Sequence, residues 1–181
     1  MLNNSESGYG SLAQLFHWLM LLIFVVLFFS AWVMTALDEG SLRSLLYSLH
    51  KSLGVTALLL VVLRLAWRFL QVQPRPLSLE AQQRNMARLA HLSLYLLMFA
   101  MPVSGYLMSV AGGYGVEYFG LFSIPELVAE DKSMSDTAAA VHGLLAWLLL
   151  MLVAVHAMAA FWHHRVAGDD TLRRMLPGYR G

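Results

Sequence analysis

The sequence predicts an all-α fold, an integral membrane bundle of four helices, on two observations. Hydrophobic residues make up 59% of the 181 residues and charged residues only 13%, well below the quarter that is usual in soluble domains. The apolar residues also gather in four long stretches, and a helix of about 20 apolar residues crosses the hydrocarbon core of a bilayer. A net charge of +1, with the basic residues scattered, gives no basic surface for nucleic acid, so nucleic-acid binding is excluded.

The four stretches set the expected helices within a single domain of residues 1–181. The first is too long for the core of a signal peptide and no basic stretch precedes it, so we expect it to remain as a helix. Proline-rich residues 71–78 and glycine-rich residues 111–120 are expected to be non-helical, the second as an irregular cap. The helices are expected at about residues 12–37, 45–69, 89–110 and 138–162.

The basic residues predict the orientation, because cytoplasmic loops near helix ends are enriched in Lys and Arg. Most of them flank the second connection or lie in the C-terminal tail: Arg64, Arg68, Arg75, Arg84, Arg88, Arg165, Arg173, Arg174 and Arg180. The opposite side has only Arg43, Lys51 and Lys132, beside an acidic loop. We therefore expect both termini in the cytoplasm.

Histidines inside the apolar stretches are the first functional candidates, because ionisable side chains are costly in the hydrocarbon region. His17 lies near the cytoplasmic end of the first helix, and His50 lies near the outer end of the second. His142 and His156, both in the fourth helix, lie within about 40° of one face and about 21 Å apart along the axis. Each therefore has a partner at its own depth: His50 for His142 and His17 for His156.

Two imidazoles that approach from opposite walls of a bundle can hold a haem iron at both axial positions. A zinc or copper ion would need three or four ligands within about 2 Å of it, which histidines four turns apart cannot supply. Because the chain has no cysteine, thiolate sites and covalently attached haem are also excluded. The alternative is that each histidine is a structural residue, hydrogen-bonded within the bundle.

Three further residues are candidates for haem binding. Gly54 follows His50 by one turn and leaves room for a flat porphyrin. Arg64 lies on nearly the same face as His50 but about 21 Å deeper, where it can pair with the inner propionates or extend to the lipid head groups. Lys51 is the corresponding candidate at the outer end, by adjacency alone.

Several sequence motifs follow one another along the chain: FHWLM (16–20), His50 with Gly54, VVLRLAWRF (61–69), HLSLYLLMFAMPVSG (91–105), VHG, VHAMAAFWHH and DDTLRRMLPG (169–178). In order and spacing they resemble the bacterial cytochrome b561 family, four-helix di-haem membrane proteins, over nearly the whole chain. The family's haem-ligand pattern falls on the four histidines that the depth argument selects. The resemblance implies two haem b groups and a location in the bacterial inner membrane.

The resemblance also implies electron transfer between a small-molecule or protein donor at the periplasmic face and a membrane quinone. Some members are similar to superoxide oxidases, which pass electrons from superoxide to ubiquinone, so the implied activity is that of an oxidoreductase. His91 and His163 are candidates for hydrogen bonds to a quinone, with a structural role at the membrane interface as the alternative. Two other functions are a cytochrome b anchor and electron-transfer subunit for a partner dehydrogenase or hydrogenase, and a haem-free transporter.

Overall fold

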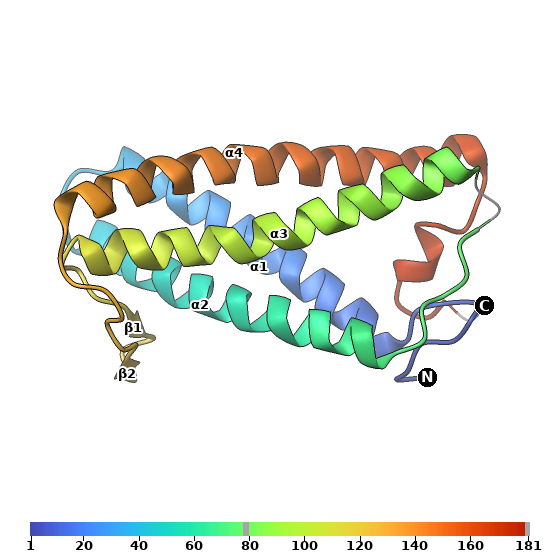
Figure 1. Cartoon of the computed structure of the whole chain (residues 1–181), viewed down its shortest axis with the longest axis horizontal. Coiled ribbons are helices and arrows are strands. Elements are labelled where there is room, and N and C mark those ends of the chain that lie inside the picture. The colour runs from blue at the N-terminus through green and yellow to red at the C-terminus, as the bar shows by residue number, and fades with distance from the viewer. Residues whose placement is uncertain (78–79, 180–181) are drawn as a thin grey trace.

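The computed structural model of the chain describes residues 1–77 and 80–179, so Ser78 of the predicted connector and Arg180 of the predicted basic tail lie outside the described residues. Four long helices lie side by side (Figure 1): α1 (Ser11–Ala36), α2 (Ser41–Leu70), α3 (Ala81–Ala111) and α4 (Lys132–Trp162). Each is long and apolar enough to cross a membrane. The predicted all-α membrane bundle is therefore confirmed.

Three of the helices begin earlier than expected. The bounds of α1 differ from the prediction by one residue at each end, but α2, α3 and α4 begin at residues 41, 81 and 132 rather than 45, 89 and 138. The added turns are polar, so hydropathy alone does not find them, whereas backbone hydrogen bonding continues through them. Asp131 starts α4 as an N-cap, because its side chain accepts a hydrogen bond of 2.9 Å from the N–H of Met134.

The helices are neighbours in chain order, with close backbone contacts from α1 to α2, α2 to α3 and α3 to α4. Residues 1–10 and residues 168–179 lie at the same end of the bundle (Figure 1). We call this the inner end, expected to face the cytoplasm, and the opposite end the outer end.

An apolar layer fills the middle of the bundle. It draws on all four helices and consists of Met20, Ile23, Phe24, Leu27, Ala57, Val61, Leu94, Met98 and Leu149. On α1 this layer runs from Met20 to Leu27 and so lies between His17, toward the inner end, and Ser30, toward the outer end. The side of the helices that faces away from the interior of the bundle is also apolar, with large side chains such as Trp32 and Leu59 exposed. This is the pattern of a bundle surrounded by lipid.

Three segments outside the long helices close the inner end, and we call them the inner cover: residues 1–10, 71–77 and 168–179. The indole N–H of Trp18 on α1 donates a hydrogen bond of 2.7 Å to the carbonyl of Met175 in the tail. Arg75 forms an ion pair of 2.7 Å with Glu6, which joins the connector to the N-terminal segment. The inner end of the bundle is therefore covered by protein.

Residues 112–131 form the outer cap, which is irregular as predicted but carries a hairpin that was not. Strands β1 (Glu117–Tyr118) and β2 (Phe122–Ser123) pair in antiparallel fashion, with Glu117 opposite Ser123. We call residues 117–123 the cap hairpin. In Figure 1 it projects sideways from the outer end, beside α2. Its turn is closed by a hydrogen bond of 2.9 Å from the N–H of Leu121 to the carbonyl of Tyr118.

Candidate functional site

The outer pair of histidines meets across the interior of the bundle. The ring centres of His50 on α2 and His142 on α4 are 6.4 Å apart. At Nδ1 each ring contacts a serine hydroxyl of a neighbouring helix at 3.1 Å, Ser30 for His50 and Ser104 for His142. Each hydroxyl already donates its proton to a carbonyl of its own helix, so it accepts from Nδ1–H. Both rings are therefore the tautomer whose Nε2 is unprotonated and able to bind a metal.

The inner pair is formed by His17 on α1 and His156 on α4, whose ring centres are 6.3 Å apart. Arg64 on α2 donates a hydrogen bond of 3.1 Å to Nδ1 of His17. A third imidazole, that of His91 on α3, lies with its ring centre 5.6 Å from that of His156. The structure therefore brings together both histidine pairs that were matched by depth and adds His91 to the inner one.

The spacing within each pair fits one iron atom held between two imidazoles. A bond from a metal to an imidazole nitrogen is about 2 Å long and the ring centre lies about 1 Å behind that nitrogen, so rings on opposite sides of one metal have centres about 6 Å apart. The observed separations are 6.3 and 6.4 Å. Among residues 1–77 and 80–179, no group of three or more His, Cys, Asp or Glu side chains converges on one metal position. Two separate two-histidine sites agree with both facts.

Two glycines control the space around the outer pair. A Cβ atom on Gly54 would meet no atom within 4 Å, so α2 leaves open space on the side of the helix that carries His50. At Gly105 on α3, a Cβ atom would lie 2.9 Å from Cε1 of His142, closer than real Cβ atoms come. The backbone of α3 can approach the ring of His142 only because residue 105 has no side chain.

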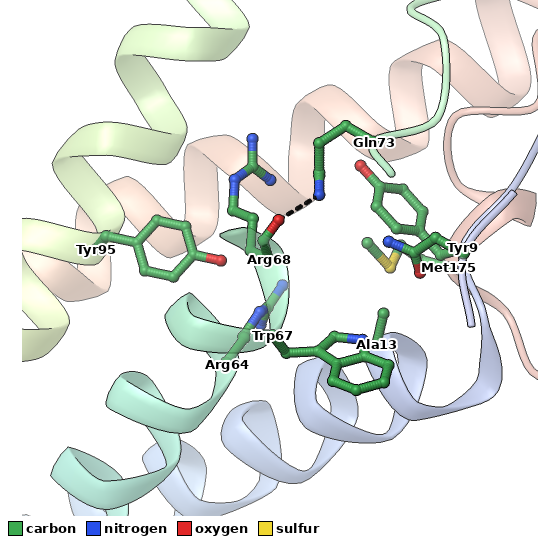
Figure 2. A pocket seen from close by; sticks show the side chains of 9 residues that line it. Tyr9, Ala13, Arg64, Trp67, Arg68, Gln73, Tyr95 and Met175 are labelled. Atoms are coloured by element: carbon green, nitrogen blue, oxygen red, sulfur yellow. Dashed lines mark hydrogen bonds between the residues drawn. The ribbon is translucent and has the colours of Figure 1, made fainter. Parts of the chain in front are cut away.

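A hollow opens at the inner end of the bundle, beside the inner cover (Figure 2). Arg64, Trp67 and Arg68 of α2 line it, together with Tyr95 of α3 and residues of the inner cover. The Arg64 guanidinium lies 6.0 Å from the centre of the Tyr95 ring, so Arg64 points into the bundle and not toward the lipid head groups. Within the described part of the chain, the buried Nε1 of Trp67 has no hydrogen-bond partner. Two guanidinium groups and a free indole N–H suit a carboxylate ligand.

Lys51 connects the outer cap to the bundle. Its ammonium group donates to Oγ of Ser109 at 3.3 Å and to the carbonyls of Gly115 at 2.9 Å and Tyr114 at 3.4 Å. Adjacency to His50 suggested a partner for an outer propionate, whereas the structure places the Lys51 ammonium against neutral oxygens of α3 and the cap. These direct acceptors are uncharged, and the carboxylate of Glu117 in the cap, which attracts the ammonium from farther away, offsets part of its charge at the outer face.

The two quinone candidates lie in different surroundings. His91 stands beside His156 at the inner pair, whereas His163 lies where α4 continues into a π-helical turn, η1 (His163–Ala167). Nδ1 of His163 is 2.6 Å from a carboxylate oxygen of Asp169, and both side chains are about one-fifth exposed. The contact by which Asp169 fastens the tail to His163 was not predicted from the sequence.

The carboxylate of Asp169, beyond the membrane-spanning segment, has a lowered pKa. Burial raises this pKa, but hydrogen bonds from the hydroxyl and N–H of Thr171 and from His163 bring it below the usual 3.8. A carboxylate with a lowered pKa stabilises the folded state above its ordinary pKa, and that contribution is lost as the pH falls through the lowered value. The tail should therefore stay docked near neutral pH and loosen only in strong acid.

This is testable by amide hydrogen exchange in residues 169–176, corrected for the intrinsic effect of pH. We expect protection in the unaltered chain at pH 6 that disappears as the pH falls below 3.8. Asp169→Asn should exchange several-fold faster already at pH 6, because the charged acceptor is gone. Asp170→Asn is the matched control, since Asp170 pairs with an exposed arginine, Arg173. Equal protection in Asp169→Asn and the unaltered chain would contradict the role of the carboxylate.

Some residues around the histidine pairs have sequence features that could have identified them but were not used as evidence. Ser30 is an isolated hydroxyl in the apolar run of α1, and Ser104 is one in α3, a position where a polar side chain needs a partner. Gly105 closes the longest of the motifs. Trp67 could not be found from the sequence, because the unpaired N–H of its indole is visible only in the fold.

The comparisons with known proteins agree with one another. A family model described as prokaryotic cytochrome b561 matches residues 8–178. Cytochrome b561 homolog 2 of Escherichia coli (strain K12) is 38% identical over 175 residues, which cover 96% of this chain and 93% of that protein. A protein of Yersinia pestis named "Probable superoxide oxidase CybB" is 30% identical over 169 residues, 91% of this chain and 93% of that protein. Cytochrome b561 homolog 1 of Escherichia coli is 28% identical over 89% of this chain and 92% of its own length.

Proposed function

Since this chain belongs to the prokaryotic cytochrome b561 family, multi-pass bacterial membrane proteins that bind haem b and transfer electrons, we propose that it holds two haem b groups and passes electrons from a donor at the outer end to a quinone at the inner end. The observation that carries this proposal is the pairing of four imidazoles at two depths, with ring centres 6.4 and 6.3 Å apart. Bound haem would supply one-electron redox chemistry at both depths.

His50 and His142 would hold the outer group, and His17 and His156 the inner one. Ser30 and Ser104 orient the outer rings and keep Nε2 free, the outer-shell role that hydroxyl and carbonyl partners have for metal-binding histidines. Gly54 and Gly105 provide space on either side. With two imidazoles to hold it, a haem bound at the outer site would supply one-electron transfer and would not bind oxygen.

Arg64 has a role that depends on the tautomer of His17. A guanidinium only donates, so Nδ1 of His17 is an acceptor while Arg64 is bonded to it at 3.1 Å. Binding of a metal at Nε2 requires the other tautomer, with the proton on Nδ1, and Arg64 then loses this acceptor. We assign the released guanidinium, with Arg68 and the free N–H of Trp67, to the inner propionates in the hollow that these residues line (Figure 2).

Reduction of a quinone consumes two electrons and two protons, so the inner end needs groups that bind a carbonyl and deliver protons. His91, beside the inner pair, and His163, in contact with the carboxylate of Asp169 at 2.6 Å, are the candidates. An imidazole coupled to a carboxylate can take up a proton from the cytoplasm and pass it on. We therefore place the quinone on the inner side of the bundle.

At the outer end we propose a small anion as the donor, namely superoxide, because a relative 30% identical is named a probable superoxide oxidase. Two superoxide ions would each lose one electron to become O2, and one quinone would take up both electrons. The test uses the purified chain in nanodiscs with ubiquinone: superoxide is added, and ubiquinol formation is followed. Formation by the isolated chain supports the proposal and argues against an anchor that needs a partner dehydrogenase. No ubiquinol formation by chain loaded with haem would reject superoxide as the donor.

The two basic residues nearest the outer pair along α2 should attract such an anion. Arg43 lies over the ring of Tyr47 at 5.7 Å, and Lys51 is held in the cap. We expect Arg43→Gln combined with Lys51→Gln to lower the bimolecular rate of haem reduction in stopped-flow mixing by roughly tenfold at low salt, because electrostatic steering is lost.

A loosened cap would also change the rate, but not in a salt-dependent way. The difference between the variant and the unaltered chain should therefore shrink as salt screens the charges. Lys132→Gln is the control: it removes one positive charge from the outer end of α4, where Lys132 is paired with Asp136 at 3.0 Å. A rate unchanged in the double variant at all salt concentrations would contradict the steering role.

A further inference from the structure

The cap hairpin (residues 117–123) is fastened to α2. Oγ of Ser52 accepts a hydrogen bond of 2.9 Å from the N–H of Phe119, and its one proton is shared between the carbonyls of Ser48 in α2 at 2.9 Å and Glu117 at 3.1 Å. One turn further along α2, the hydroxyls of Thr56 and Tyr118 are 3.2 Å apart. Ser52 is completely buried under these contacts.

The hairpin lies on the outward face of α2, away from the interior of the bundle. At about 100° per residue, Ser52, Thr56, Leu59 and Leu63 fall within about 60° of one another, whereas His50 points to nearly the opposite side. Leu59 and Leu63 are 53% and 54% exposed, as expected of side chains that contact lipid. The face that carries the hairpin thus continues, toward the inner end, into a lipid-facing surface.

The tip of the hairpin is apolar and exposed. Leu121 is 76% exposed, Phe122 56% and Phe119 43%. Phe119 and Gly120, the central residues of the turn, have positive φ values of 51° and 70°. In water such turns favour Asn, Asp or Gly at the first of these positions, and a bulky residue there is strained. Apolar surroundings of the turn would explain why a phenylalanine, and not Asn, Asp or Gly, occupies this strained position.

Several backbone groups of the hairpin are paired within the protein, which lowers the cost of placing them in lipid. A backbone N–H or carbonyl without a partner is costly there. Ser52 contacts the N–H of Phe119 and the carbonyl of Glu117, and the N–H of Leu121 bonds to Tyr118 within the turn. At the base of the hairpin the N–H of Ile124 donates to the carbonyl of Val116 at 2.8 Å.

From this placement we infer that the cap hairpin inserts its tip into the outer leaflet, with lipid as the partner of Phe119, Leu121 and Phe122. The inserted tip anchors the outer cap to the membrane. Because Ser52 follows His50 by only two residues, the anchor also restrains α2 beside the outer pair. The inference needs the chain to span a membrane but not the proposed donor or quinone.

Spin labels measure this insertion directly, because the chain has no native cysteine. Leu121→Cys and Phe122→Cys are labelled one at a time in chain reconstituted into nanodiscs, one chain per disc. Accessibility to oxygen, which concentrates in lipid, is compared with accessibility to a water-soluble nickel chelate. Leu59→Cys is the lipid-facing control, and Lys132→Cys, at an exposed position of the outer end, is the aqueous control.

We expect both hairpin labels to resemble the Leu59 label, with a ratio of oxygen to nickel accessibility several-fold above that of the Lys132 label. A ratio equal to that at Lys132 would place the hairpin in water and overturn the inference. Labels shielded from both reagents would mean that protein covers the tip, which would overturn it as well. Haem content close to that of the unaltered chain shows that each variant is folded.

Discussion

Replacing His142 with alanine is expected to halve the haem content, from the proposed two groups per chain to about one, because one of the two proposed ligands would be lost at the outer site only. The inner pair lies beyond the apolar layer, toward the opposite end of the bundle from Ser104, which orients the ring of His142. His156→Ala should instead empty the inner site. The two variants should therefore retain different haems, with different reduction potentials.

The measurement is haem stoichiometry by the pyridine haemochrome method, followed by a redox titration of the remaining absorption band. His91→Ala is the matched control: it removes an imidazole 5.6 Å from His156 that is not assigned as a ligand. It should keep both haems. Full pigment content in His142→Ala and in His156→Ala would reject the two-site proposal, and loss of haem in His91→Ala would move the inner ligand to α3.

Replacing Gly105 with alanine should have the next largest effect. The added methyl group would lie 2.9 Å from Cε1 of His142. The ring cannot simply turn away, because its Nδ1 is bonded to Ser104 at 3.1 Å and to the carbonyl of Met101 at 3.0 Å. Overpacking of this kind costs about 1–3 kcal/mol. We expect a weakened outer site, with haem content falling toward one group per chain.

Gly143→Ala is the control for this variant. Gly143 follows His142 in α4, but a Cβ atom there would meet nothing within 4 Å. Measured without haem, the thermal stability of Gly143→Ala should be equal to or above that of the unaltered chain, because alanine favours a helix over glycine, whereas that of Gly105→Ala should be lower. If Gly105→Ala retains both haems with an unchanged spectrum, the contact between α3 and the ring of His142 does not control the outer site.

The positions of the histidines were open to prediction because an α-helix converts residue number into depth. A rise of about 1.5 Å per residue was enough to match His50 with His142 and His17 with His156, and the structure places the same rings together. Their coordination of iron stays a prediction. The four helices could also be predicted, because each must present an apolar surface to lipid over the whole thickness of the bilayer.

Contacts between residues distant in the sequence could not be predicted in this way. The roles of Lys51 and Ser52 depend on a cap more than 60 residues away in the chain, and the ring of His91 approaches His156 only through the packing of α3 on α4. The early starts of α2, α3 and α4 were missed because their first turns are polar. Hydropathy identifies the part of a helix that lies in lipid, not the whole helix.

The apolar layer between the histidine pairs has an electrical consequence. It offers water no polar partners, so protons have no path through it, whereas electrons can tunnel across. Each electron moved from the outer to the inner pair would therefore travel without a compensating ion over about 21 Å of the roughly 30 Å core. In a bacterium whose interior is negative, that displacement runs uphill by about 1.6 kcal/mol per 100 mV. Turnover in energised vesicles should accordingly slow as the voltage across the membrane rises.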